Sequence, residues 1–330
     1  MFQAAKTLRD FGILSYLSRN SHGAALEDIA EQNGISAYGA MVLLEAGLSL
    51  DLVMVKDDKY FLSKVGYFIN DDPMIRISMD FSGNVNYKGA FYLDESVKQE
   101  KPLGLLKEFG DHNTVYEALS ALPGKFRESW FGFNKYFSNA AFDEALPVLF
   151  KNDPKKILDM GGNTGRFAVK CCEHAENVRV AILDLPGQIK DAEEYINAKG
   201  MQDRIDIIPI NFLDFSQPYP AGFDVIWMSQ FLDCFSDKEA RHILRKTVEI
   251  MDDDVELYIM EPLWDKQKAD ASVYSLHAVS LYFTFMANGN SRIYHSDDLM
   301  KLIRSVGLKI IDWYDQIGIS HSIIKCKKGF

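Results

Sequence analysis

Apolar residues near the start of the chain first recur at helical spacing and then form two short runs. Between residues 4 and 20 they return at helical spacing, which predicts one amphipathic helix. A second helix is expected over Ala25–Gln32 and a third over Ser36–Leu48, where Ser36 is a typical N-cap residue. Two short apolar runs then flank Lys56–Lys59 and predict a hairpin. Helix, helix-turn-helix and hairpin together are typical of a winged helix.

The following segment, residues 84–150, has a mainly helical pattern and is rich in aromatic residues. Aromatic side chains at helical spacing usually belong to a core, so packing is one interpretation. The other is that the segment lines the pocket of a planar substrate, because it lies between the winged helix and the rest of the chain. The candidates for that role are Trp130, Phe133 and Phe137, together with Met286 from a later helix.

From residue 151 onward, short apolar runs alternate with helical patterns. This alternation predicts an α/β domain with a mostly parallel, doubly wound sheet. The last two apolar runs, over 308–313 and 320–327, have no helix between them, which indicates an antiparallel edge strand. The chain is therefore expected to have three parts. These are a winged-helix domain over residues 1–83, a helical region over 84–150 and an α/β domain over 151–330.

A glycine-rich turn lies between the first two predicted strands of the third region. The spacing is Asp159-x-Gly161-x-x-x-Gly165, and the second strand ends on Asp184, where an acid can accept hydrogen bonds from ribose hydroxyls. A dinucleotide site would have G-x-G-x-x-G, and Asp159 would repel a pyrophosphate, whereas an acid is favourable beside the cationic amino-acid end of S-adenosylmethionine. The turn therefore favours an S-adenosylmethionine site over a dinucleotide site or a plain packing turn.

Composition and charge exclude several classes of partner. The 330 residues are 47% hydrophobic and 25% charged, with a net charge of −11, which argues against nucleic acid and anionic membranes. The third helix of the winged helix carries only Glu45 and, at its end, Asp51, so protein contacts are favoured over DNA binding. The start has no signal-peptide pattern and no run could span a bilayer, so the expected location is cytoplasmic. The four cysteines lack paired spacing, and no metal site is expected.

Several motifs carry a resemblance to a known family over nearly the whole chain. The winged-helix start, the helical middle, DMGGNTG ending at Gly165, LDLP over 183–186, and Glu261-Pro262 look like the dimeric S-adenosylmethionine-dependent O-methyltransferases of the plant caffeate and bacterial polyketide-tailoring type. This resemblance implies a Rossmann-like methyltransferase sheet and an N-terminal domain that forms a homodimer and completes the partner's acceptor pocket.

The resemblance also implies which residues bind the cofactor. Gly161 and Gly165 correspond to the positions under the methionine end, and Asp184 to the position that holds the ribose. Asn211 and Phe212 stand where the family has an acid and a large apolar residue against the adenine, and an Asn oxygen can still accept from the adenine amino group. The full set expected at the cofactor is Asp159, Gly161, Gly162, Asn163, Gly165, Asp184, Leu185, Asn211, Phe212, Ser229 and Gln230.

The chain departs from the family at the catalytic base. Asp233 stands where the family has a His that deprotonates a phenol; Glu261 matches an acid flanking that base, and Ser291 replaces a second one. A phenol of pKa about 10 and an ordinary Asp of about 3.9 differ by roughly six units. Burial and the charge of Glu261 could raise the pKa of Asp233, the acceptor could be unusually acidic, or the proton could leave late in the reaction.

Other residues could also take the role of base. His277 lies on the helix that lines the acceptor pocket in the family, and His295 lies beside a predicted helix start. Asp233 could instead cap the helix that begins near Asp237. The catalytic candidates are thus Asp233, Glu261 and His277.

The expected function is methylation of an aromatic hydroxyl on a small molecule of secondary metabolism. Because the usual base is missing, a second hypothesis is a relative that keeps the cofactor but catalyses decarboxylation or hydroxylation. A third hypothesis, from a different class, is a winged-helix regulator that binds DNA.

Overall fold

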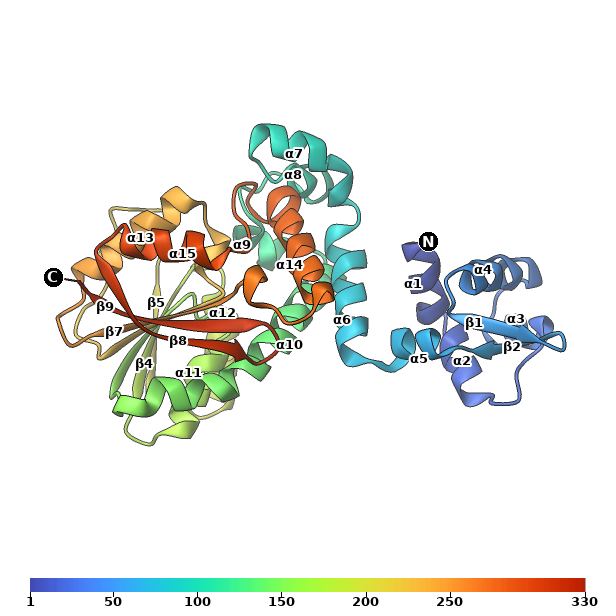
Figure 1. Cartoon of the computed structure of the whole chain (residues 1–330), viewed down its shortest axis with the longest axis horizontal. Coiled ribbons are helices and arrows are strands. Elements are labelled where there is room, and N and C mark those ends of the chain that lie inside the picture. Colours follow the sequence, from blue (N-terminus) through green and yellow to red (C-terminus); the bar gives the residue numbers. More distant parts are fainter. Residues whose placement is uncertain (330) are drawn as a thin grey trace. The chain divides into compact units, whose positions relative to one another are not determined.

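The computed structural model describes residues 1–329, which form two compact units (Figure 1). The first unit contains residues 1–87 and 128–133, and the second contains the other described residues, 88–127 and 134–329. The three-part division expected from the sequence stays a prediction. Each unit is described below by itself.

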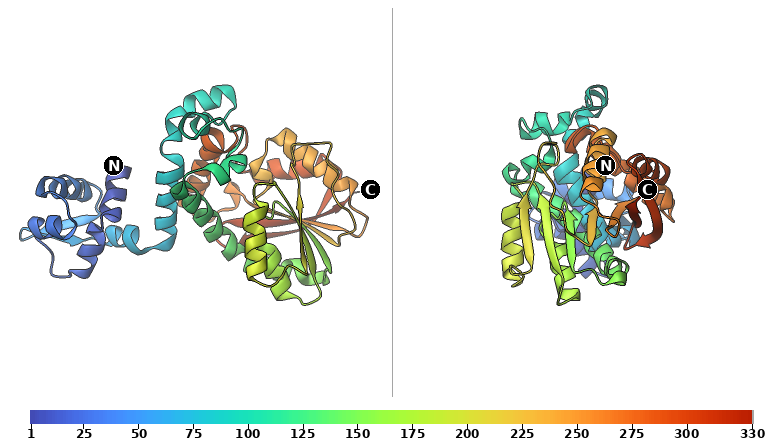
Figure 2. Two further views of the ribbon diagram at one scale, coloured as in Figure 1. Left: turned by 180° about the vertical axis from the view of Figure 1, so that it is seen from behind. Right: turned by 90° about the vertical axis from the view of Figure 1, so that its left-hand side faces the viewer.

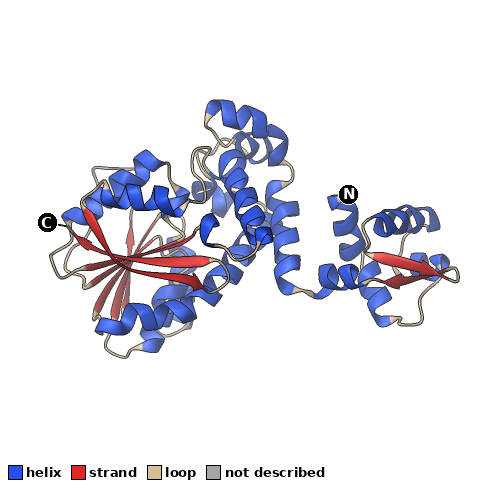
Figure 3. Cartoon of the chain, in the orientation of Figure 1, coloured by secondary structure: helices blue, strands red, loops and turns tan. Residues whose placement is uncertain are grey.

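The first unit is mainly helical with one small sheet (Figure 3). Its core is formed by apolar residues of the first four helices, of strand β1 and of helix α6, together with Ala24 and Leu52. The elements are α1 (Phe2–Asp10), α2 (Ile13–Arg19), α3 (Leu26–Gln32), α4 (Ala37–Ser49), β1 (Val53–Lys56), β2 (Lys59–Leu62), α5 (Lys64–Asp71), α6 (Pro73–Phe81) and a π-helical turn, η1 (Ser82–Asn86).

The single helix expected over residues 4–20 is wrong. The helix ends at Asp10, and α2 begins after Gly12, whose φ of 85° places it in the left-handed region. Glycine adopts this conformation without the steric penalty of a side chain, so the chain changes direction there although the apolar spacing continues. Periodicity alone does not register such a break.

The helix-turn-helix and hairpin of the first unit are confirmed. The Ser36 hydroxyl accepts from the Gly39 N–H at 3.0 Å and caps α4, as expected. The strands β1 and β2 pair antiparallel, with Val53 opposite Leu62 and Lys56 opposite Lys59. These elements give the winged-helix arrangement that the sequence predicts.

The second unit begins with short helices and then enters one long helix. The long helix α10 spans 26 residues, although Pro147 lies within its last turn. Residues 128–133 of this helix are grouped with the first unit. The elements before the sheet are η2 (Gly89–Tyr92), α7 (Leu93–Gln99), α8 (Leu103–Phe109), α9 (Val115–Ala118), η3 (Leu119–Ala121), α10 (Gly124–Leu149) and η4 (Phe150–Asn152).

A seven-stranded sheet follows, in the order β5-β4-β3-β6-β7-β9-β8. The strands β3 to β7 are parallel, and β9 pairs antiparallel with both β7 and β8. The predicted antiparallel strand is thus β9, and β8 forms the edge beside it. The strands are β3 (Lys156–Met160), β4 (Arg179–Asp184), β5 (Ile205–Pro209), β6 (Val225–Ser229), β7 (Glu256–Pro262), β8 (Leu308–Ile317) and β9 (His321–Lys328).

Helices cover both faces of this sheet (Figures 1 and 2). One face packs against α13 and α15, and the other against α11, α12 and the end of α10. Strand order reverses between β3 and β6, so their carboxyl ends form the crevice where open α/β sheets bind ligands. The helices are α11 (Arg166–His174), α12 (Ile189–Ala198), η5 (Leu232–Cys234), α13 (Asp237–Glu249), η6 (Trp264–Lys266), α14 (Asp270–Tyr282), the π-helical η7 (Phe283–Ala287) and α15 (Ser296–Arg304).

None of the helices in residues 1–329 combines the length and apolar content that a membrane crossing requires.

Candidate active site

The glycine turn joins β3 to α11 at the point where strand order reverses. Gly161 and Gly165 have φ values of 77° and 71°, and Asn163 has 50°, so three positions of the turn are left-handed. The Gly161 N–H donates to the Leu183 carbonyl at 2.8 Å and ties the turn to β4. The backbone therefore reverses sharply directly beside the end of both strands.

The glycines of this turn are required by its packing. A Cβ on Gly161 would lie 2.4 Å from the Phe231 ring, and a Cβ on Gly162 would lie 2.7 Å from Asp159 Oδ2. A Cβ on Gly165 would lie 3.0 Å from Ile196. The side-chain space at each position is thus filled by protein atoms, among them the Asp159 carboxylate.

Asp184 holds the turn from the end of β4. Its Oδ2 accepts from the Asn163 N–H at 2.6 Å and its Oδ1 from the Leu185 N–H at 2.7 Å. Burial raises the pKa of Asp184 to about 6, and the two backbone hydrogen bonds oppose that rise. Each carboxylate oxygen has a further lone pair, so the group can also accept from a pair of ligand hydroxyls.

Asp159 is a buried carboxylate with incomplete hydrogen bonding. Its side chain is 2% exposed, and within residues 1–329 no group donates to Oδ2. Burial, and next the charge of Asp184, raise the pKa of Asp159 to about 8. The Ser229 hydroxyl, at the end of the adjacent strand β6, is likewise buried without a partner among these residues. Unsatisfied buried acceptors of this kind suit a cationic donor.

Asn211 and Phe212 lie after strand β5, and Gln230 lies after strand β6. Asn211 Oδ1 accepts from the Leu213 N–H at 3.0 Å, and Phe212 is buried with its ring 4.7 Å from that of Phe231. Gln230 has a φ of 49° and donates from Nε2 to the Ser138 hydroxyl at 2.8 Å. The residues proposed from the sequence for the cofactor therefore gather at the carboxyl ends of β3, β4, β5 and β6.

Asp233 lies in the 3-10 turn η5, directly after β6. It is 4% exposed, and burial raises its pKa to about 7. The Cys234 thiol lies within hydrogen-bond distance of Asp233 Oδ1 at 3.5 Å and of the Gln230 carbonyl at 3.6 Å, and it is also hydrogen-bonded to Tyr116 of α9. Asp233 is thus a buried acid that titrates near neutrality, with a thiol as its side-chain partner.

Glu261, at the end of β7, holds the backbone of the same turn. Its Oε1 accepts from the N–H groups of Phe231 at 3.0 Å and Leu232 at 2.8 Å, while Oε2 has no partner within residues 1–329. Burial, and next the charge of Asp233, raise the pKa of Glu261 well above its ordinary value. Glu261 therefore fixes the turn through its backbone.

The helix-cap interpretation of Asp233 is wrong. The cap of α13 is Ser236, whose hydroxyl accepts from the Glu239 N–H at 3.3 Å. The Glu239 carboxylate in turn accepts from the Ser236 N–H at 2.9 Å and completes a capping box. Asp233 is not needed for this cap.

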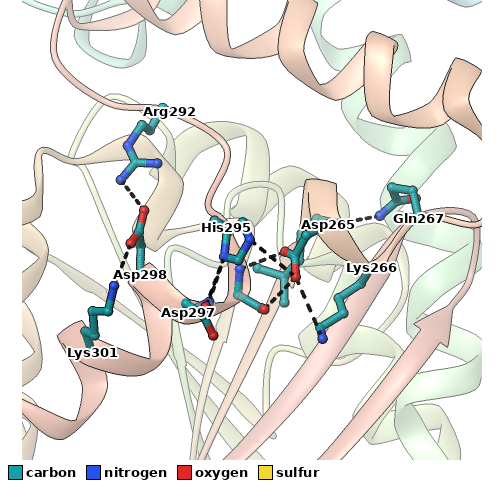
Figure 4. Close-up of polar contacts among 10 residues, drawn as sticks. Asp265, Lys266, Gln267, Arg292, His295, Asp297, Asp298 and Lys301 are labelled. Atoms are coloured by element: carbon teal, nitrogen blue, oxygen red, sulfur yellow. Dashed lines mark hydrogen bonds and ion pairs between the residues drawn. The ribbon is translucent and has the colours of Figure 1, made fainter.

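The two candidate histidines contact the same tryptophan. His277 of α14 is exposed, and its ring lies 4.9 Å from that of Trp264. The His295 ring lies 4.8 Å from Trp264, and its Nδ1 accepts from the Asp297 N–H at 3.0 Å. His295 is thus the cap of α15, and its Nε2 lies 3.9 Å from Asp265 (Figure 4).

The residues proposed to line the substrate pocket are divided between the two units. Trp130 and Phe133 belong to the first unit, where Phe133 stacks on Phe81 with 4.2 Å between ring centroids. Phe137 and Met286 belong to the second unit, and Met286 is fully buried. Their role toward a substrate stays a prediction.

Two family models match the chain. The Dimerisation2-like domain matches residues 1–60, and the O-methyltransferase domain matches residues 134–309, more than half of the chain. The chain belongs to the O-methyltransferase family. It is an S-adenosylmethionine-dependent O-methyltransferase with a dimerisation domain, and the function class and cofactor predicted from the sequence are confirmed.

Individual relatives of this O-methyltransferase are distant. It is 22% identical over 281 residues to the L-tyrosine C(3)-methyltransferase of Streptomyces lavendulae, covering 84% of this chain and 75% of the relative. It is 26% identical over 262 residues to the 3-hydroxy-5-methyl-1-naphthoate 3-O-methyltransferase of Streptomyces sahachiroi, covering 76% and 72%.

Solved structures confirm the fold of the O-methyltransferase. The mitomycin 7-O-methyltransferase is similar with a TM-score of 0.77 and 18% identity, covering 99% of this chain and 94% of that one. An O-methyltransferase from neocarzinostatin biosynthesis, solved with S-adenosylmethionine and 2-hydroxy-5-methyl naphthoic acid, gives a TM-score of 0.72 and 18% identity, covering 99% and 95%.

Several polar residues of the O-methyltransferase site were not predicted from the sequence. Tyr116, Asn288 and Tyr294 all approach the turn that carries Asp233, yet they come from separate segments far along the chain. The Asn288-Gly289 pair is a turn signal, but such a signal does not indicate which distant backbone group the Asn contacts.

Proposed function

We propose that this O-methyltransferase methylates the hydroxyl of a small aromatic acceptor and that Asp233 takes the proton from that hydroxyl. The observation that carries the proposal is the buried position of Asp233, where burial raises its pKa to about 7. In this chain the Asp233 carboxylate can therefore act as the base, the role that a His has in the family.

The raised pKa removes about half of the pKa mismatch between an Asp and a phenol. An ordinary Asp lies roughly six units below a phenol of pKa about 10, which corresponds to about 8 kcal/mol for complete proton transfer. At a pKa of about 7 the difference is roughly three units, or about 4 kcal/mol, which is similar to the value for an ordinary His. Of the three explanations considered for the Asp, burial is the one with direct support.

The cofactor fits the polar groups that lack partners. When bound, S-adenosylmethionine supplies an electrophilic methyl group for an in-line displacement by the acceptor oxygen. Asp184 would accept from the ribose hydroxyls, and the unsatisfied Asp159 Oδ2 and Ser229 hydroxyl suit the cationic amino-acid end. Asn211 and Phe212 would contact the adenine. We propose no direct catalytic step for Glu261, which holds the Asp233 turn.

The aromatic acceptor is supported by the relatives. One acts on L-tyrosine and another on a naphthoate, and a similar structure holds a naphthoic acid. A role in secondary metabolism agrees with these names. We also propose a cytoplasmic homodimer. The Dimerisation2-like domain supports the dimer, and the four free cysteines agree with a reducing compartment.

The test is incubation with labelled S-adenosylmethionine and a panel of phenols, catechols and hydroxybenzoates. We expect labelled product from at least one aromatic hydroxyl compound, with the methyl group assigned to oxygen by nuclear magnetic resonance. Tight cofactor binding with no labelled product from any member would contradict the proposal. Loss of carbon dioxide or gain of oxygen, detected by mass spectrometry, would instead favour the decarboxylase or hydroxylase hypothesis.

A further inference from the structure

The turn that carries Asp233 is held on both sides of the acid. Before it, Glu261 accepts from the Phe231 and Leu232 N–H groups. After it, the Cys234 carbonyl accepts from Asn288 Nδ2 at 2.7 Å. Asn288 follows the π-helical turn η7 and lies 54 residues further along the chain. Its hydrogen bond is thus a long-range contact to the peptide group next to the acid.

The orientation of the Asn288 amide is fixed by its other atom. Asn288 Oδ1 accepts from the Asn290 N–H at 3.2 Å and from both the N–H at 3.2 Å and the hydroxyl at 3.0 Å of Ser291. The reverse orientation would place an oxygen against the Cys234 carbonyl and an NH2 group against backbone donors. The donor therefore points at Cys234.

The rest of the 288–296 segment has anchors of its own. The Ile293 N–H donates to the Ser280 hydroxyl at 3.1 Å. Ser296 donates to Asp265 from both its N–H at 2.7 Å and its hydroxyl at 2.6 Å, at the site shown in Figure 4. Removal of the Asn288 amide would release the Cys234 carbonyl and the donors of Asn290 and Ser291, while Ile293 and Ser296 hold the rest of the segment in place.

We propose that Asn288 is a positioning residue that sets the place and the proton affinity of Asp233 by fixing the Cys234 peptide. The inference rests on the proposed role of Asp233 as base. Cys234 follows Asp233 directly and its thiol lies within hydrogen-bond distance of Asp233 Oδ1, so its orientation controls both the backbone and the side-chain partner of the acid. The other titratable groups that face Asp233 are Glu261 from β7, Tyr116 from α9 and Tyr294 from the 288–296 segment.

Two variants of Asn288 should move the pH profile of kcat in opposite directions. Asn288→Ala frees the turn and admits water, so the pKa of Asp233 should fall and the acidic midpoint of the profile should move below about 7. Asn288→Asp keeps the acceptor toward Ser291 but brings a third carboxylate near Asp233 and Glu261, so the midpoint should rise. We expect each shift to be at least about half a pH unit. Both variants should lower the maximal kcat by about tenfold to 100-fold, because the base is misplaced.

Two control variants separate positioning from stability. Ser296→Ala removes the hydroxyl bond to Asp265 at the far end of the same segment, and Asn33→Ala removes a 2.7 Å bond from an Asn amide to the Ile29 carbonyl in the first unit. Both should lower the melting temperature and leave the pH midpoint unchanged. A purely structural role of Asn288 would leave the midpoint of Asn288→Ala at the wild-type value, and that result would overturn the inference.

The Asp233→Asn variant, measured alongside, separates this inference from the proposed function. If Asp233→Asn is nearly inactive while both Asn288 variants keep the wild-type midpoint and kcat, only the positioning role fails. If Asp233→Asn keeps full activity at every pH, the base assignment fails and the inference fails with it.

Discussion

The sheet presents two pairs of carboxylates, and each pair lies near the carboxyl ends of two adjacent parallel strands. Asp159 and Asp184 lie at the ends of β3 and β4, Glu261 lies at the end of β7, and Asp233 follows β6. In each pair one carboxylate accepts two backbone N–H groups: Asp184 from Asn163 and Leu185, and Glu261 from Phe231 and Leu232. These two acids maintain the shape of the turns.

The other two acids, Asp159 and Asp233, are available for ligand binding or proton transfer, and their surroundings differ. Asp159 Oδ2 has no donor within residues 1–329, whereas Asp233 Oδ1 has a thiol at 3.5 Å. The pKa of Asp159 is raised to about 8 and that of Asp233 to about 7. A permanent cation can hold Asp159 ionised, whereas a group that must gain and lose a proton needs a pKa near the working pH. The difference suits cofactor binding at one pair and proton transfer at the other.

The largest effect is expected for Asp233→Asn. The amide cannot accept the acceptor's proton, so kcat should fall by about 10²–10⁴-fold while cofactor affinity stays nearly intact. In the wild type, kcat should rise as the pH increases through about 7, because the ionised form of Asp233 is the proposed base. The variant should lose this rise. Steady-state kinetics from pH 5.5 to 8.5 and calorimetric titration with S-adenosylhomocysteine measure the two quantities.

Two results for Asp233→Asn would contradict the division into a cofactor-binding pair and a proton-transfer pair. A tenfold loss of cofactor affinity at unchanged kcat would place Asp233 at the cofactor. Full activity would transfer the base role to His277 or leave the reaction to positioning alone.

A smaller effect is expected for Asp159→Asn, on binding. Because the pKa of Asp159 is raised to about 8 in the free protein, a bound cation should drive release of nearly one proton at pH 7. Affinity should therefore tighten as the pH rises toward about 8. The variant should bind about tenfold more weakly and release almost no proton, since a bond to a charged group contributes about 1.5–3 kcal/mol. Calorimetry in two buffers of different ionisation enthalpy counts the protons.

The same variant should stabilise the free protein. A raised carboxyl pKa means that the folded state retains a proton that the unfolded state loses, so stability falls as the pH rises from about 4 to about 8. An Asn at this position does not ionise, so the variant does not lose stability in this way as the pH rises. A gain of about 1 kcal/mol in the free energy of unfolding would raise Tm by about 2–4 °C. A lower Tm at pH 8 would contradict the interpretation of Asp159 as an uncompensated acid.

The smallest effect is expected for Ser236→Ala, three residues after Asp233. This change removes the capping box of α13 and should lower the free energy of unfolding by about 1 kcal/mol. Thermal unfolding should show a lower Tm, and kcat should stay within about twofold of the wild type. A large loss of kcat at unchanged Tm would mean that this cap takes part in catalysis.

Much of the fold could be predicted from the sequence because its signals are local. The Ser36 cap, the hairpin after it and the alternation of strands and helices from residue 151 depend on neighbouring residues only. The break at Gly12 was missed because apolar spacing continues across it. The sequence predicted an antiparallel edge strand from the last two runs but not which of them forms the edge, because strand order depends on packing between distant elements.

The site could be predicted only in part. The glycine turn and Asp184 carry a short motif, so their place could be read from the sequence. The pKa of Asp233 depends on burial among residues that no motif connects, such as Tyr116 and Asn288. Sequence reasoning could therefore identify an acid at the position of the base but not the surroundings that change its acidity.

The ring of Phe231 occupies the place that a side chain on Gly161 would need. The same Phe231 gives its N–H to Glu261, so one residue contacts both the glycine turn and the acid that holds the Asp233 turn. Directed evolution toward a new acceptor that enlarges residue 161 or alters 231 alone would disturb both turns at once. A smaller residue at 231 would make space for a side chain at 161, but the φ of 77° at Gly161 would still strain it, so libraries should keep Gly161 and vary 231.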